Sequence, residues 1–384
     1  MNTHDHRHTA LTRYYLNPTR RVLRNGCFAE LPEVLDLFKP RSILLVLGEK
    51  SFRTSPYFAR LEEMLAPYRV VETSAIAQNP TQSFVQNQID EIRNKPFDLV
   101  LAIGGGSVLD VAKILAVIPQ QAQTDLAIYC CGTVPLTATP LTLIAIPTTA
   151  GTGSEVTPYA SLETKEKKKI TISHDSFYPT LALIDPELCY SMPAYVTAST
   201  GFDALSQAIE SFWSVGTTPF SRTHSLRSLE LILRSLATTT REPAHAQGRW
   251  NMSLASCEAG LAIAQTKTTA VHSVSYPITA HFRIAHGHAC ALTLASFVRF
   301  NAPVLKDAGQ PMLNLCNARD YEGLARQIEG MMDEVGLERS LTKLGIDEKG
   351  MELIVRDGFR PDRIKNNPRP VQAEDLRKIL MAIR

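Results

Sequence analysis

Residues that could bind a metal are concentrated between Thr266 and Leu294, in a mostly apolar and weakly charged segment. This segment holds four of the ten histidines, namely His272, His281, His286 and His288. A neutral imidazole is a common ligand of divalent metals, because its ring nitrogen donates without first losing a charge. Upstream, Asp203 and Gln207 lie four residues apart in a helical pattern, which puts both side chains on one face. These groups could converge on one ion; alternatively, Asp203 caps a helix and the histidines lie in the core.

Two loops rich in glycine and hydroxyl groups could bind a nucleotide. The segment GGGSVLDVAK (104–113) follows an apolar run and opens a helical pattern, so its glycines and free N–H groups could face a phosphate. The segment PTTAGTGSEVT (147–157) follows another apolar run. One such loop is often only a tight turn. Two of them after parallel strands of one sheet predict a dinucleotide site.

The elements that would hold these loops alternate between strands and helices in the first half of the chain. Short continuous apolar runs predict buried parallel strands at 42–47, 69–73, 98–103, 142–146 and 181–184. Helical patterns fall between them, at 29–37, 57–65, 81–94 and 108–117. This alternation predicts an α/β, Rossmann-like domain with a doubly wound parallel sheet over residues 1–190. The lysine run 165–169 is expected on a solvated hairpin.

The second half of the chain shows helical patterns only. They cover 200–213, 219–237, 253–275, 287–300, 320–335 and 373–382. We therefore expect an all-α domain over residues 191–384, with the domain boundary near residues 190–193.

Composition limits the possible partners and the compartment. The 384 residues are 44% hydrophobic and 20% charged with a net charge of +2, which is typical of a soluble globular enzyme without a nucleic-acid partner. The seven cysteines are scattered and form no CxxC pair, which indicates reduced thiols and a cytoplasmic protein. The start of the chain reads as a polar tail with His4, His6 and His8, without the apolar segment of a signal peptide. No apolar run reaches the roughly 18 residues of a membrane span.

The order of the motifs resembles a known family. GGGSVLDVAK, PTTAGTGSEVT, Asp203 and two histidines fourteen positions apart, His272 and His286, resemble the iron-containing, or group III, alcohol dehydrogenases over essentially the whole chain. The strings KTTAVHSVSYP, HGHACALTL and ESFWSV are similar to the phosphonoacetaldehyde reductase branch, also called 2-hydroxyethylphosphonate dehydrogenases. The resemblance implies a dehydroquinate-synthase-like architecture, with the active site in the cleft between the two domains.

The resemblance also implies a set of site residues. Gly104, Gly105, Gly106 and Ser107 would hold the pyrophosphate, with Asp110 on the same helix. Thr148 and Thr149, with Ser154 nearby, would line the cofactor, and Lys169 would contact the nicotinamide ribose. Asp203, His272 and His286 match metal ligands. The expected enzyme is an NAD(P)-dependent, metal-containing alcohol dehydrogenase, expected as a homodimer, in which the metal polarises an aldehyde that accepts hydride from the nicotinamide.

Two positions depart from the family pattern. Gln207 stands where the family usually has a histidine, so one ligand is weaker or absent, and the metal could be Fe²⁺ or Zn²⁺. Tyr276 stands where many relatives carry a further histidine that has been regarded as a proton carrier. The proton donor to the alkoxide stays open between water, a cofactor ribose hydroxyl, Tyr276 and His281. Core packing is the other interpretation of Tyr276.

The turn at 48–53, GEKSFR, bears on the choice of cofactor. Glu49 could accept hydrogen bonds from a ribose diol, which favours NADH. Lys50, Ser51 and Arg53 could instead hold a 2′-phosphate. Three potential donors against one acid favour NADPH slightly, with use of both cofactors expected.

The expected reaction is reduction of a small aldehyde, with phosphonoacetaldehyde to 2-hydroxyethylphosphonate as the preferred hypothesis. An anionic head group needs cations. Candidates are Lys267, predicted on one helix with His272, and the loop residues Arg363, Lys365 and Arg369. The alternatives are a general short-chain alcohol dehydrogenase, a dehydroquinate-synthase-like lyase, and a non-catalytic homologue that has lost its metal.

Overall fold

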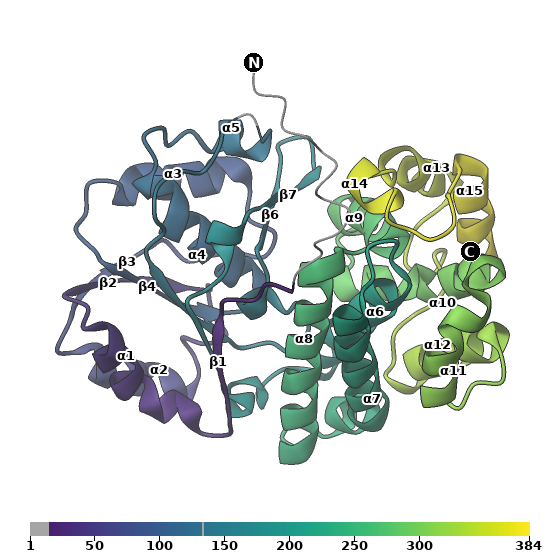
Figure 1. The fold of residues 1–384 in the computed structure, drawn as a ribbon, viewed down its shortest axis with the longest axis horizontal. Coiled ribbons are helices and arrows are strands. Elements are labelled where there is room, and N and C mark those ends of the chain that lie inside the picture. Colours follow the sequence, from purple (N-terminus) through teal and green to yellow (C-terminus); the bar gives the residue numbers. More distant parts are fainter. Residues whose placement is uncertain (1–14, 133) are drawn as a thin grey trace.

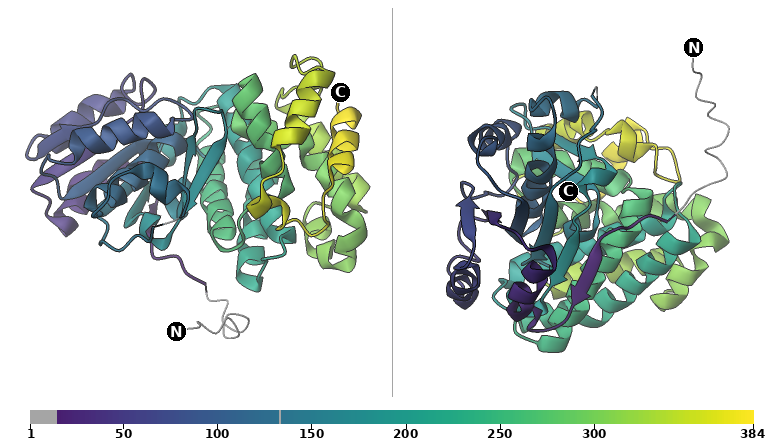
Figure 2. Two further views of the ribbon diagram at one scale, coloured as in Figure 1. Left: turned by 90° about the horizontal axis from the view of Figure 1, so that it is seen from above. Right: turned by 60° about the vertical axis from the view of Figure 1, so that its left-hand side comes forward.

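The structure is a computed structural model that describes residues 15–132 and 134–384. The predicted polar tail with His4, His6 and His8 lies outside the described residues. Figures 1 and 2 show the sheet half, in purple to teal, beside the helical half, in green to yellow.

A parallel sheet of six strands forms the centre of the first half, in the order β1-β8-β5-β4-β2-β3. The strands are β1 (Arg20–Leu23), β2 (Ser42–Leu47), β3 (Arg69–Glu72), β4 (Leu99–Gly104), β5 (Thr142–Pro147) and β8 (Leu181–Ile184). Leu45 pairs with Leu101, and Ile103 pairs with Ile146. Every residue of β2 and β4 is buried, which confirms that the apolar runs form parallel strands covered on both faces.

Helices cover both faces of this sheet. Alternate side chains of a strand point to opposite faces. Ile43 and its equivalents pack with α1 (Leu31–Phe38) and α2 (Pro56–Leu65), whereas Leu44 and its equivalents pack with the helices on the other face. These are α3 (Gln82–Ile92), α4 (Gly106–Val117) and α5 (Leu126–Cys130). The predicted doubly wound α/β fold is therefore confirmed (Figure 1).

A two-stranded antiparallel hairpin extends from the sheet half toward the helices (Figure 1). It consists of β6 (Tyr159–Glu163) and β7 (Lys169–Ser173), and Glu163 pairs with Lys169. Residues 165–168 are exposed at its turn, as predicted for the lysine run. Lys169, at the start of β7, is the partly buried end of that run.

The second half is helical, as predicted. Its helices are α6 (Ala194–Trp213), α7 (Pro219–Arg241), α8 (Ala246–Thr266), α9 (Ala270–Phe282), α10 (His286–Leu305), α11 (Gln310–Leu315), α12 (Tyr321–Glu334), α13 (Glu348–Asp357), α14 (Pro361–Ile364) and α15 (Ala373–Ala382). The domain boundary near residues 190–193 stays a prediction; β8 ends at Ile184 and α6 begins at Ala194. Within residues 15–132 and 134–384, no helix has the length and apolarity that a membrane span requires.

The prediction of one helix over 253–275 is wrong. Helix α8 ends at Thr266, Lys267 takes a backbone angle φ of +59°, and α9 begins at Ala270. Asn366 stabilises the break by donating hydrogen bonds to the carbonyls of Thr266 and Thr268, at 2.6 and 3.0 Å. The threonine-rich sequence TKTT forms helix poorly and contains neither glycine nor proline, so it gave no ordinary stop signal.

Candidate active site

A cavity of about 960 Å³ lies between the sheet half and the helical half. It is at the upper end of the roughly 300–1,000 Å³ range of small-molecule sites. The segments that follow β2, β4 and β5 open into it, and α6, α9 and α10 form much of the opposite wall. Ligands of parallel α/β sheets bind at the carboxyl ends of the strands, so this position fits a dinucleotide.

The two glycine-rich loops meet at the cavity. Gly104, Gly105, Gly106, Ser107, Thr148 and Thr149 all line it. Helix α4 begins at Gly106 with its free N–H groups at the cavity, which suits a phosphate. A side chain at Gly104 would collide with Val108, and one at Gly106 would collide with Thr152. The loops therefore need glycine because they pack tightly against neighbouring side chains.

Asp110 and Ser154 also line the cavity, but they hydrogen-bond to each other. The Ser154 hydroxyl donates to Asp110 over 2.5 Å, and the fully buried Lys113 donates to Ser154 over 2.7 Å and to the Tyr159 carbonyl over 2.8 Å. Burial lowers the pKa of Lys113 to about 8, against the charges of Asp110 and Glu155. This network ties α4, the second loop and the hairpin into one rigid wall.

The turn after β2 brings Glu49, Lys50 and Ser51 to the cavity. Arg53 is not among the cavity-lining residues. Its guanidinium forms an ion pair with Glu72 and donates to the Gly48 carbonyl over 3.3 Å. Lys50 and Ser51 are therefore the donors left for a 2′-phosphate.

Substitution of Lys50 should distinguish the two cofactors. We expect the Lys50→Ala enzyme to lose about tenfold in kcat/KM with NADPH, because a charge-assisted hydrogen bond contributes about 1.5–3 kcal/mol. The value with NADH should change little, whereas Glu49→Gln should lower the NADH value selectively. Steady-state oxidation of both cofactors measures this, and an equal loss with NADPH and NADH in Lys50→Ala would show that Lys50 does not bind the phosphate.

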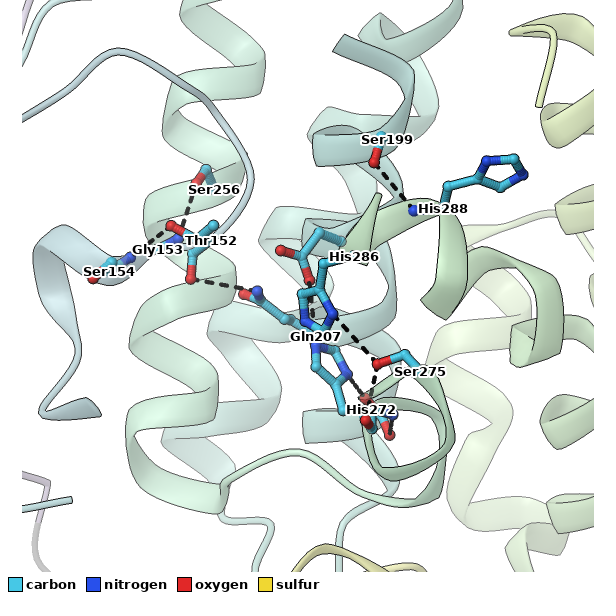
Figure 3. Close-up of polar contacts among 12 residues, drawn as sticks. Thr152, Gly153, Ser154, Ser199, Gln207, Ser256, His272, Ser275, His286 and His288 are labelled. Atoms are coloured by element: carbon cyan, nitrogen blue, oxygen red, sulfur yellow. Dashed lines mark hydrogen bonds and ion pairs between the residues drawn. The ribbon is translucent and has the colours of Figure 1, made fainter. Parts of the chain in front are cut away.

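The predicted metal-binding side chains come together on the helical side of the cavity (Figure 3). Oδ1 of Asp203, in α6, lies 3.2 Å from Nε2 of His272 in α9. The same oxygen lies 4.0 Å from Nε2 of His286 in α10. Gly287 allows this approach, because any side chain there would collide with the Ser199 carbonyl of α6. The donor atoms of these three residues and of Cys290 all lie within 4.8 Å of one another.

Gln207 faces the same cluster. Its Nε2 donates to the Thr152 carbonyl over 3.3 Å (Figure 3), and its buried Oε1 has no hydrogen-bond partner among the described residues. Leaving a buried amide oxygen unpaired costs free energy. An ion at the centre of the cluster would remove that cost.

The ionisation of Asp203 and His286 also suits a cation. Burial raises the pKa of Asp203, but His286, His272 and Lys169 outweigh it and hold that pKa below its ordinary value. Burial and the charge of Lys169 lower the pKa of His286 well below its ordinary value, so the ring is neutral and can donate. The donor set of one carboxylate, two imidazoles and an orphaned amide oxygen therefore fits a divalent metal, with Cys290 as a further donor in reach.

Tyr276 and two cations occupy the cavity wall beside the cluster. The Tyr276 ring stacks on His286 with centroids 5.7 Å apart, and Nζ of Lys169 lies 4.9 Å from the centre of that ring. Arg363 in α14 lies near the phenol and acts on its pKa. Burial raises the pKa of Tyr276, but Arg363, Lys169 and His272 outweigh it and lower that pKa below its ordinary value.

Four residues predicted near the substrate are not among the residues that line the cavity: Lys267, His281, Lys365 and Arg369. Lys267 is exposed in the break between α8 and α9, so the prediction that it shares a helix with His272 and reaches past the metal is wrong. His281 hydrogen-bonds to Asp357 over 3.0 Å at the far end of α9. Arg369 stacks on Phe300 and donates to its carbonyl, which ties the loop to α10.

Two family profiles match the two halves of the chain. "Iron-containing alcohol dehydrogenase" matches residues 18–186, and "Fe-containing alcohol dehydrogenase family, C-terminal" matches residues 197–384. The chain belongs to the iron-containing alcohol dehydrogenase family. The predicted enzyme class and cofactors are thereby confirmed: it is an NAD(P)-dependent, metal-containing alcohol dehydrogenase that uses one divalent metal.

Individual relatives in the iron-containing alcohol dehydrogenase family differ in their substrates. The chain is 32% identical to long-chain-alcohol dehydrogenase 1 of Geobacillus thermodenitrificans, covering 81% of each chain. It is 29% identical to phosphonoacetaldehyde reductase of Streptomyces viridochromogenes, covering 86% of this chain and 87% of the relative. The crystal structure of sulfoacetaldehyde reductase from Bifidobacterium kashiwanohense with NAD⁺ superposes with a TM-score of 0.90 at 32% identity, covering 96% and 98%.

Proposed function

We propose that this dehydrogenase reduces a small aldehyde with an anionic head group to the primary alcohol. Phosphonoacetaldehyde, which gives 2-hydroxyethylphosphonate, is the preferred substrate in this proposal. Two relatives are named for two-carbon aldehydes with a tetrahedral oxyanion, a phosphonate and a sulfonate. Their likeness supports the class of substrate.

The main support for this proposal is the buried position of Arg363 at the cavity wall. Its side chain is only 7% exposed, although it lines the cavity, and its Nε has no hydrogen-bond partner among the described residues. The one described carboxylate in ion-pair range is Asp362, 3.5 Å away and half exposed. A buried guanidinium whose one described carboxylate partner is half exposed is costly. Its planar donors suit a bidentate phosphonate or sulfonate, which would compensate that cost.

The residues of the cavity then have distinct tasks. When bound, a metal would supply a Lewis acid for the carbonyl, and a reduced nicotinamide would supply the hydride. Asp203, His272 and His286 hold the metal, and Arg363 holds the anionic head so that the carbonyl carbon is oriented for attack. Tyr276 donates the phenolic proton to the alkoxide oxygen, helped by the cations that lower its pKa.

A general short-chain alcohol dehydrogenase is the second candidate. It is supported by relatives named for short neutral alcohols, such as the NAD-dependent methanol dehydrogenase of Bacillus methanolicus, which is 28% identical over 79% of this chain. The family profiles favour both candidates over a dehydroquinate-synthase-like lyase. The donor set around Asp203 argues against a homologue that has lost its metal. The cytoplasmic location, the homodimer and the absence of nucleic-acid and membrane partners stay predictions.

Unreactive analogues of the head group test the anion site without requiring turnover. Ethylphosphonate and ethanesulfonate should inhibit aldehyde reduction competitively. Their inhibition constants should be at least about tenfold lower than the inhibition constant of neutral propionamide. Propionate carries a planar carboxylate, so its inhibition constant shows whether the site prefers a tetrahedral anion to a planar one. Equal inhibition by charged and neutral analogues would favour the general alcohol dehydrogenase.

A further inference from the structure

A second carboxylate lies directly behind the metal-binding cluster. Glu210 in α6 is fully buried, one turn after Gln207. Its Oε1 accepts hydrogen bonds from the backbone N–H of Thr269 at 2.9 Å, the Thr269 hydroxyl at 2.7 Å and the backbone N–H of His272 at 3.3 Å. Its Oε2 contacts Nδ1 of the His272 ring.

The donors around Glu210 define the direction of each hydrogen bond. A backbone N–H can only donate. The Thr269 hydroxyl accepts from the indole N–H of Trp213 over 3.0 Å, which leaves its own hydrogen free for Glu210. Oε1 is therefore an acceptor three times over. When Glu210 is a carboxylate, its Oε2 is an acceptor too, so the proton between it and His272 belongs to Nδ1.

The other ring nitrogen of His272 then faces the metal. With the proton on Nδ1, the lone pair of Nε2 is left for an ion bound in the cluster, where Oδ1 of Asp203 lies 3.2 Å from Nε2. Within residues 15–132 and 134–384, Nδ1 of His286 has no carboxylate partner and makes a long contact of 3.4 Å with the Ser275 hydroxyl (Figure 3). The two histidines are thus held unequally, and His272 is the rigid one.

We propose that Glu210 is a positioning residue that fixes His272 in its Nδ1–H tautomer and thereby sets the affinity of the site for its metal. The inference rests on the metal site used in the proposed function. It does not depend on which aldehyde is reduced. Carboxylates that orient metal-bound histidines in this way typically change metal affinity by about 10- to 100-fold when they are replaced.

Glutamine at position 210 should impose the wrong tautomer. Its single oxygen has to face the three donors around Oε1, because an NH₂ group there would oppose them. The NH₂ group then faces Nδ1 of His272 and donates to it. That arrangement moves the imidazole proton to Nε2 and removes the lone pair from the metal position, although the side chain keeps its size.

Metal affinity is the readout for this variant. We expect full-length Glu210→Gln to bind Zn²⁺ about 10- to 100-fold more weakly than wild type, measured by competition with a chromophoric chelator. The matched control is Glu258→Gln. Glu258, in α8, pairs with Nδ1 of His224, in α7, at 2.5 Å. Both residues lie outside the metal cluster and are not among the residues that line the cavity. Glu258→Gln should keep the wild-type affinity. Equal affinity of Glu210→Gln and wild type overturns the proposal.

Nitrogen NMR of the wild-type protein tests the proposal without a variant, so the result does not depend on how well Glu210→Gln folds. In Zn²⁺-loaded protein labelled with ¹⁵N-histidine, His272 should carry its proton on Nδ1 and bind through Nε2. Binding through Nδ1, or a proton on Nε2, overturns the proposal. If wild type binds Zn²⁺ as described but does not prefer anionic aldehydes, the proposed function fails and the role of Glu210 stands.

Discussion

Alanine in place of Asp203 should remove most of the bound metal and at least about a thousandfold of kcat/KM. Among the described residues, Asp203 is the carboxylate that lies within reach of both His272 and His286 in the cluster. A Lewis-acid metal contributes several kcal/mol to the transition state, and each 1.36 kcal/mol corresponds to about tenfold in rate. Metal analysis of the purified variant, together with NADH and NADPH oxidation in the presence of aldehyde, measures both effects. An Asp203→Ala enzyme with full metal content and activity would put the metal elsewhere.

Gln207→His provides the complementary substitution. The Oε1 atom of Gln207 is buried and unpaired among the described residues, so an imidazole at this position should retain or increase metal affinity. Weaker metal binding by Gln207→His would show that this side chain does not face the ion.

Methionine in place of Arg363 should affect anionic aldehydes selectively. We expect KM for phosphonoacetaldehyde to rise about 10- to 100-fold, because hydrogen bonds to charged groups contribute about 1.5–3 kcal/mol, while KM for propanal changes little. Methionine keeps much of the length of the side chain and loses the guanidinium, which lies 5.9 Å from the centre of the Tyr159 ring. The control is Lys365→Met, since Lys365 is exposed two residues further on and does not line the cavity. An equal rise in KM for phosphonoacetaldehyde and for propanal in Arg363→Met would show that Arg363 does not bind the anionic head group.

The parts of the fold that were predictable depend on local sequence. The run SILLVL became β2 at the predicted bounds, since a strand covered on both faces needs an uninterrupted apolar run. The loop at Gly104–Gly106 was predictable because an apolar run before three glycines and a helical pattern after them mark a turn from a strand into a helix. Asp203 and Gln207 shared a helical face because their spacing of four residues dictates it.

The residues that were missed depend on contacts between distant segments. The break at Lys267 forms because Asn366, about 100 residues away, and Glu210 satisfy the polar groups of the freed backbone. Glu210 itself gave a usable signal, as an acid among apolar residues on the face of Asp203 and Gln207. Cys290 lies one turn after His286, but a cysteine in an apolar helix usually packs as a small hydrophobic residue. The burial of Arg363 depends on α14 packing against α9 and is invisible locally.

The ratio of kcat/KM for phosphonoacetaldehyde and for propanal, measured on the metal-loaded wild-type enzyme with saturating nicotinamide cofactor, tests the central claim most directly. The buried guanidinium of Arg363, whose Nε is unpaired among the described residues, should favour the charged substrate at least about tenfold, the effect of one charge-assisted interaction of about 1.5 kcal/mol. A ratio of ten or more in favour of phosphonoacetaldehyde is the predicted result. Equal values, or a preference for propanal, would contradict the account and identify a general short-chain alcohol dehydrogenase.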